Sequence, residues 1–186
     1  MFERGYKTWC EQISLRLRVE LGVRSSDPLD SWKLAEYLNV EVKTTGQFSA
    51  LSREDRLQLE QDDSWSAVTL EVPGRKVVIL KDSNSPGRKS SDLTHELAHQ
   101  LLDHKANGIG VSMGGHLMVH AFSREEEDQA NWLSACLLLP RPALLHIKKL
   151  FRDDAEAARV YKVSVAMLKY RLGVTGVTYQ LRRTNT

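Results

Sequence analysis

The chain has 186 residues, of which 41% are hydrophobic and 27% are charged, and its formal net charge at pH 7 is +2. This length suits a globular protein of one domain, or of one domain with a small appendage. The weak net charge gives no argument for a nucleic-acid partner, although it leaves room for a local basic patch. The two cysteines, Cys10 and Cys136, form no C-x-x-C motif, and this sparse usage indicates a reducing cytoplasm.

The hydropathy pattern shows no export or membrane segment. The N-terminal residues Met1-Phe2-Glu3-Arg4 lack the apolar core and the cleavage site of a secretory signal. The longest apolar run, residues 135–140, is far shorter than the ~20 residues of a membrane span. We therefore expect a cytoplasmic protein without a membrane partner.

Short helix and strand patterns alternate in the N-terminal half. We expect helices at residues 6–21, 31–38 and 52–61 and a strand at residues 40–44. In the first helix, Trp9, Ile13, Leu17 and Leu21 lie on one apolar stripe. Asp30 suits the cap of the second helix.

A β-hairpin and a longer helix are predicted next. Residues 66–72 and 76–80 flank a Pro-Gly-Arg turn, and the continuous apolar run in the second strand suggests that it is covered on both faces. Ser85 and Pro86 suit the cap and the first position of a helix that runs to about Asp103. We interpret the glycine-rich residues 105–116 as a connecting loop, with a lid over a cleft as the alternative.

The longer helix carries the sequence His95-Glu96-Leu97-Ala98-His99, which is an H-E-x-x-H motif. Residues four apart share one face of a helix, so both histidines can direct an imidazole nitrogen at one metal ion. Glu96 lies about 100° around the helix, at roughly 3.6 residues per turn, and can take a proton from a metal-bound water without being a ligand. Because only three positions are fixed, the motif also occurs by chance on solvated helices.

A third ligand is needed, since a catalytic zinc ion usually has three protein ligands and one water molecule. The extended motif H-E-x-x-H-x-x-G-x-x-H is excluded because Leu102 and Lys105 stand where it requires glycine and histidine. His116 and His120 are rival ligands, but the glycines beside them disfavour a helix, and we interpret both as surface or packing residues.

A helix expected at residues 123–139 offers a carboxylate instead. Ser123 and Glu126 form a capping box at its start, and Pro140 ends it. Glu127 shares a face with small and apolar residues, where a carboxylate is costly unless it binds protons or a metal. The equal alternative is that Glu127 is solvated within the acidic run 125–128.

The surroundings of the second histidine suggest one supporting residue. Asp103, four residues after His99, lies on the helical face from which a carboxylate could orient the imidazole. On the same helical projection, His104 is expected to face away from the site.

Two sequence blocks are more specific than the motif alone. Ser90 to His104 is similar to a pattern H-E-L-G-H followed by x-L-L-H, with Ala98 in place of glycine and Asp103 in place of histidine. Residues 127–140 are similar to E-x-x-A-N-x-F-A-A-x-L-L-M-P, with Leu133 and Leu139 as apolar exchanges. With these blocks the chain resembles the ImmA/IrrE family of zinc metallopeptidases.

The resemblance implies that His95, His99 and Glu127 bind zinc, with Mn²⁺ as an alternative metal, and that Glu96 is the catalytic base. It implies an α+β, zincin-like fold in which a small mixed or antiparallel sheet packs on the H-E-x-x-H helix. We place the peptidase domain at residues 1–148 and a helix-turn-helix-like C-terminal unit at residues 149–186.

The C-terminal unit reads as helix, turn and helix over residues 155–173, with Ser164 capping the second helix. If the unit contacts DNA, Lys169 and Arg171 would lie near phosphates. We prefer the alternative, in which the unit packs on the peptidase core and its basic residues are solvated, because the net charge is weak.

The resemblance implies a zinc-dependent endopeptidase that cleaves a helix-turn-helix transcriptional repressor and thereby derepresses mobile-element, phage or stress genes. Two alternatives stay open. One is a non-catalytic regulator that binds a repressor or DNA, and the other is a component of a toxin–antitoxin system.

Overall fold

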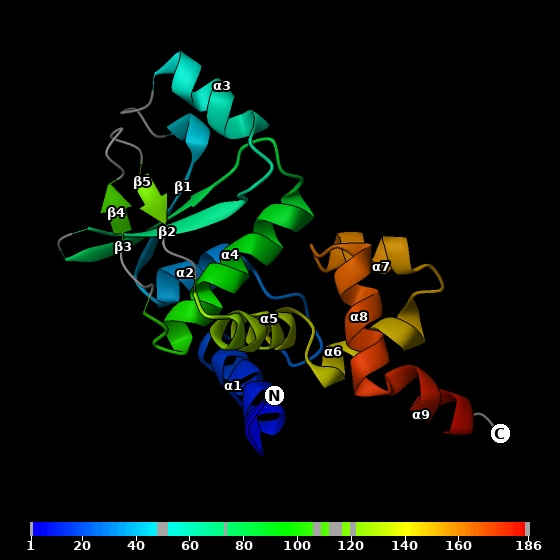
Figure 1. The fold of residues 1–186 in the computed structure, drawn as a ribbon. Helices are drawn as coiled ribbons and strands as arrows, with labels where there is room; N and C mark the ends of the chain where they lie inside the picture. The colour runs from blue at the N-terminus through cyan, green and yellow to red at the C-terminus, as the bar shows by residue number, and fades with distance from the viewer. Residues whose placement is uncertain are drawn as a thin grey trace.

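The computed structural model describes residues 2–47, 52–72, 74–105, 109–111, 117–119 and 122–184. The elements within these residues are α1 (Tyr6–Glu20), α2 (Ser31–Tyr37), β1 (Val40–Thr44), the 3-10 turn η1 (Thr45–Gln47), α3 (Arg53–Gln61), β2 (Ala67–Val72), β3 (Arg75–Leu80), α4 (Pro86–Leu101), β4 (Ile109–Val111), β5 (Leu117–Val119), α5 (Arg124–Leu138), α6 (Arg141–Leu150), α7 (Asp154–Val160), α8 (Val165–Thr175) and α9 (Val177–Thr184). The sheet, α4, α5 and α1 lie in successive layers, and α7 to α9 form a group beside them (Figure 1).

The three-stranded sheet is mixed. Its order is β1-β3-β2, with β1 parallel and β2 antiparallel to the central strand β3. The last four residues of β3, Val77 to Leu80, are all buried, which confirms that this apolar run is covered on both faces. β2 is therefore an edge strand, and its register places Thr69 opposite Val78.

The region expected to be only a connecting loop contains the strand β4, which pairs with β5 directly after that region. β4 and β5 pair antiparallel, with Ile109 opposite Val119. The prediction of a plain connection over residues 105–116 is wrong at β4, because short β-branched and apolar runs on either side of the glycines can pair as a hairpin. The glycine-rich residues 106–108 and 112–116 lie outside the described residues.

Helix α4 is the centre of the first hydrophobic cluster. It contacts β2 and β3 on one side and α5 on the other, and its Leu93 and Leu97 are fully buried. The predicted cap is confirmed: Ser85 Oγ accepts a hydrogen bond from the Arg88 N–H at 3.3 Å, and Pro86 occupies the first turn. The helix that carries the H-E-x-x-H motif therefore starts where predicted and buries these two leucines.

Helix α1 packs on α5 with a stripe that differs by one position from the prediction. Ile13 and Leu17 are buried as expected, but Cys10 takes the place of Trp9, which is 37% exposed. Trp9 instead stacks on Tyr6 with ring centroids 5.9 Å apart. Aromatic stacking at the surface therefore competes with burial of this indole.

The C-terminal helices enclose a second hydrophobic cluster, which begins at the end of α5. Its buried members are Leu138, Leu139, Ala143, Leu144, Ile147, Ala157, Ala158, Tyr161, Val163, Leu168, Leu172 and Val177. Ser164 caps α8 by accepting a hydrogen bond from the Met167 N–H at 3.0 Å. The boundary predicted after residue 148 falls within α6, which packs in this cluster, and the division into two domains stays a prediction.

Helices around a small mixed sheet confirm the expected α+β class. Within the part of the chain that the structure describes, no helix combines the length and the apolar character that crossing a membrane requires.

Candidate metal centre

Helices α4 and α5 bring His95, His99 and Glu127 to one point. The Nε2 atoms of the two histidines are 3.0 Å apart. Glu127 Oε2 lies 3.2 Å from His95 Nε2, and Glu127 Oε1 lies 3.7 Å from His99 Nε2. Among the described residues this is the one cluster of three His, Cys, Asp or Glu side chains close enough to share an ion.

The three side chains fit a zinc ion. Tetrahedral bonds of about 2.0–2.1 Å hold ligand atoms roughly 3.3 Å apart, and the distances found between 3.0 and 3.7 Å lie around that value. Two imidazoles and a carboxylate are also a donor set found in zinc peptidases. Manganese, which accepts carboxylate and imidazole ligands, is compatible with the same set.

The two histidines differ in exposure. The His99 side chain is 3% exposed, and Phe122 stacks on its ring with centroids 3.6 Å apart and planes at 15°. Burial, and to a smaller extent the neighbouring His95 and His104, lower the pKa of His99 to about 3. His99 is therefore held neutral, which is the form that binds a metal. The His95 side chain is more exposed, at 23%.

Glu96 is held beside the cluster by the edge strand. Thr69 Oγ1 donates a hydrogen bond to Glu96 Oε2 at 2.5 Å. Burial raises the pKa of Glu96, and the hydrogen bond from Thr69 and the charge of His95 oppose that rise. A partly buried carboxylate with a raised pKa is a stronger base than a solvated glutamate.

Glu127 occupies the first turn of α5, as expected from the capping box. Ser123 and Glu126 exchange hydrogen bonds between their side chains and backbone N–H groups, which sets the start of the helix. Of the residues expected on the inward face of Glu127, Ala130, Ser134 and Leu138 are buried and Asn131 is exposed. Glu127 itself lies against the two histidines, and its side chain is 39% exposed.

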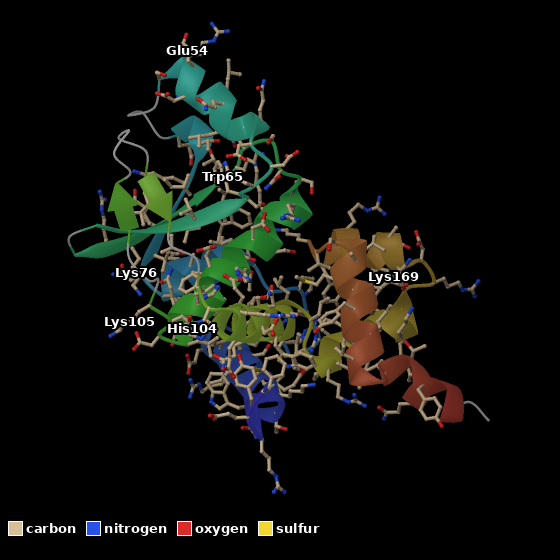
Figure 2. The ribbon with its side chains drawn as sticks, viewed as in Figure 1. Glu54, Trp65, Lys76, His104, Lys105 and Lys169 are labelled. Atoms are coloured by element: carbon tan, nitrogen blue, oxygen red, sulfur yellow. The ribbon has the colours of Figure 1, made fainter. Side chains whose placement is uncertain are left out.

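The residue that contacts His99 from behind is His104, where Asp103 was expected. Their Nδ1 atoms are 3.0 Å apart, and His104 Nε2 lies 3.0 Å from Gln129 Oε1. The helical projection fails here because α4 ends at Leu101 and Asp103 adopts a left-handed conformation with φ of 53°. This turn brings the next residue, His104, back under the helix, near the start of α5 (Figure 2).

The rival ligands His116 and His120 lie outside the described residues. Three residues that contact the site were not predicted, because no motif or spacing in the sequence points to them. Thr69 depends on strand register, Phe122 lies in the segment before α5, and Gln129 faces the site only because α5 packs against α4.

Arg171 contradicts both interpretations of the C-terminal unit, since it is neither near the surface for a phosphate nor solvated. Arg171 is fully buried, where its Nε donates to the Leu139 carbonyl at 3.1 Å and its Nη2 to Glu11. A guanidinium committed to these partners is unavailable to phosphates. Lys169 is exposed on α8 (Figure 2).

Comparisons with known proteins identify the family and support the fold. The chain resembles a solved structure described as a Mycobacterium tuberculosis transcriptional regulator, with a TM-score of 0.54 and 19% identity. The match covers 92% of this chain but 47% of that one, so this chain spans about half of its neighbour. No curated protein matches the sequence. Residues 35–173 match the peptidase family described as the IrrE N-terminal-like domain, and the chain therefore belongs to that family.

Proposed function

We propose that the protein is a zinc-dependent endopeptidase in which His95, His99 and Glu127 bind the metal and Glu96 is the catalytic base. The convergence of Glu127 with the H-E-x-x-H histidines carries this proposal, because a chance motif on a solvated helix has no reason to meet a carboxylate from another helix. The family match supports the same class of activity.

Glu96 would perform the proton transfers of peptide hydrolysis. Zinc, when bound, would lower the pKa of a water molecule to about 7 and polarise the scissile carbonyl. The Glu96 carboxylate would accept a proton from the attacking water and deliver it to the leaving amine. Thr69, which donates to Oε2, would hold the carboxylate in place and leave Oε1 available for this proton.

The edge strand β2 suggests how an extended substrate segment would lie. The hydrogen-bonding edge of β2 away from β3 pairs with no other strand among the described residues. A peptide that added to this edge would run past Thr69, and hence past Glu96. This placement favours cleavage within an extended chain over removal of a terminal residue.

We propose a helix-turn-helix transcriptional repressor as the substrate, with relief of repression of mobile-element, phage or stress genes as the consequence and the cytoplasm as the place of action. The family match supports a role in regulation, and the fold is shared with a protein described as a transcriptional regulator. Direct contact with DNA would depend on exposed residues such as Lys169, since Arg171 is buried.

Glu96→Gln tests the proposal. The amide cannot accept the proton but fills the same space, so we expect zinc content to persist while cleavage of the helix-turn-helix repressor proposed as substrate disappears. Glu125→Gln, an exposed change on α5, is the matched control and should cleave normally. Full activity of Glu96→Gln would eliminate the proposed base. A stable complex with the repressor but no cleavage by the wild-type protein would favour the non-catalytic regulator.

A further inference from the structure

Behind the proposed metal site, the side chains of His99, His104 and Gln129 form a hydrogen-bonded series. His99 Nδ1 meets His104 Nδ1 at 3.0 Å, and His104 Nε2 meets Gln129 Oε1 at 3.0 Å. The His104 N–H also donates to the His99 carbonyl at 3.0 Å, which fixes the backbone of the turn. Gln129 is fixed by α5, and its carbonyl accepts a hydrogen bond from the Tyr6 hydroxyl at 2.7 Å.

The donor and acceptor atoms of these three side chains determine the direction of the hydrogen bonds between them. An amide oxygen only accepts, so His104 Nε2 must carry the proton and donate to Gln129. If Nε2 carries the one ring proton of His104, Nδ1 has a lone pair and accepts the Nδ1 proton of His99. His99 Nε2 is thereby left with its lone pair, and this is the atom that faces His95 and Glu127.

The opposite direction is incompatible with a metal ligand. If the Gln129 amide nitrogen donated to His104 Nε2, His104 Nδ1 would donate to His99 Nδ1. The proton of His99 would then lie on Nε2, between the other two ligands. The orientation of the Gln129 amide, with Oε1 toward His104, thus determines which nitrogen of His99 is free.

We infer that His104 and Gln129 are positioning residues that fix the tautomer and the ring orientation of His99, and this inference rests on the proposed metal site. A ligand histidine usually donates its other N–H to a carboxylate, a backbone carbonyl or a water molecule. Here an imidazole and an amide perform that task without adding negative charge. The predicted partner Asp103 would have added one and would have raised the basicity of the His99 imidazole.

Zinc affinity and histidine tautomers test the inference. His104→Phe keeps an aromatic ring beside Phe122 but removes both nitrogens, and Gln129→Leu removes the terminal acceptor. We expect each to weaken zinc binding by roughly 10- to 100-fold, measured by competition with a chromophoric chelator. Gln129→Glu keeps an acceptor and should restore near wild-type affinity, and His146→Phe, on α6 outside the cluster, should leave it unchanged.

The metal-free protein gives a readout that does not depend on activity. In ¹⁵N NMR spectra of histidine, wild-type His99 should carry its proton on Nδ1, and Gln129→Leu should contain a mixture of tautomers. A wild-type His99 protonated on Nε2, or unchanged zinc affinity in both His104→Phe and Gln129→Leu, would overturn the inference. If these variants bind zinc more weakly but the wild-type protein cleaves no substrate, the positioning role of His104 and Gln129 stands and the peptidase proposal is refuted.

Discussion

Glu11 on α1 joins the two hydrophobic clusters, and its removal should be among the most destabilising single changes. Its Oε1 accepts a hydrogen bond from Arg171 Nη2, and its Oε2 accepts one from the Arg141 N–H at 2.9 Å, at the start of α6. The Arg171 side chain is 1% exposed and that of Glu11 is 26% exposed. Glu11→Ala would leave a guanidinium in the interior with the Leu139 carbonyl as its remaining partner.

The expected cost follows from this geometry. Breaking a buried ion pair by removing one partner costs about 3–5 kcal/mol. Because a quarter of Glu11 is exposed, water can replace part of the lost pairing, and we expect a loss of about 3 kcal/mol in the free energy of unfolding.

Urea unfolding followed by circular dichroism measures this loss. The double variant Glu11→Ala/Arg171→Met removes both charges, so it should be clearly more stable than the sum of the two single changes predicts. Gln12→Ala, an exposed neighbour on the same helix, is the control and should stay within about 0.5 kcal/mol of wild type. A Glu11→Ala variant as stable as that control would refute the role assigned to the pair.

Three further predictions concern the metal centre. Thr69→Val keeps the shape of the side chain but removes the hydrogen bond to Glu96. Cleavage should therefore slow by about 10- to 100-fold, with zinc content unchanged. A loss of zinc instead would show that Thr69 supports the metal ligands. Glu127→Ala should strongly reduce the zinc measured by elemental analysis, and unchanged zinc there, combined with a loss in His120→Ala, would transfer the ligand role to that histidine. The metal-free protein should lose stability as the pH falls from 6.5 toward 3, because the unfolded chain takes up a proton on His99 that the folded chain, with a His99 pKa of about 3, does not. Urea unfolding at pH 7.5 and pH 5 should show this loss. An equal loss in His99→Gln would show that His99 is not its cause.

The sequence predicted most helices and strands because their apolar periodicity and end signals agree with the packing. Ser85 with Pro86 and Ser123 with Glu126 are local signals, and local hydrogen bonds satisfy them in the structure. The clustering of Glu127 with the two histidines was anticipated through a resemblance covering two blocks, since spacing within one helix cannot specify a partner on another.

What the sequence did not predict depends on contacts between distant elements. Helical projection placed Asp103 behind His99. Asp103 instead adopts a left-handed conformation beyond the end of α4, and His104 contacts His99 in its place. Thr69 reaches Glu96 only in one register of the hairpin. Arg171 looked like a surface cation because its partner Glu11 is 160 residues away along the chain.

Helix α5 contributes buried residues to both hydrophobic clusters. Its first turn carries Glu127, while Leu138 at its last turn and the adjoining Leu139 are buried in the second cluster. An unbroken helix of 15 residues transmits a tilt from one end to the other, since its hydrogen bonds resist bending between them. A displacement of the C-terminal helices that tilted α5 would therefore move Glu127 relative to His95 and His99 on α4.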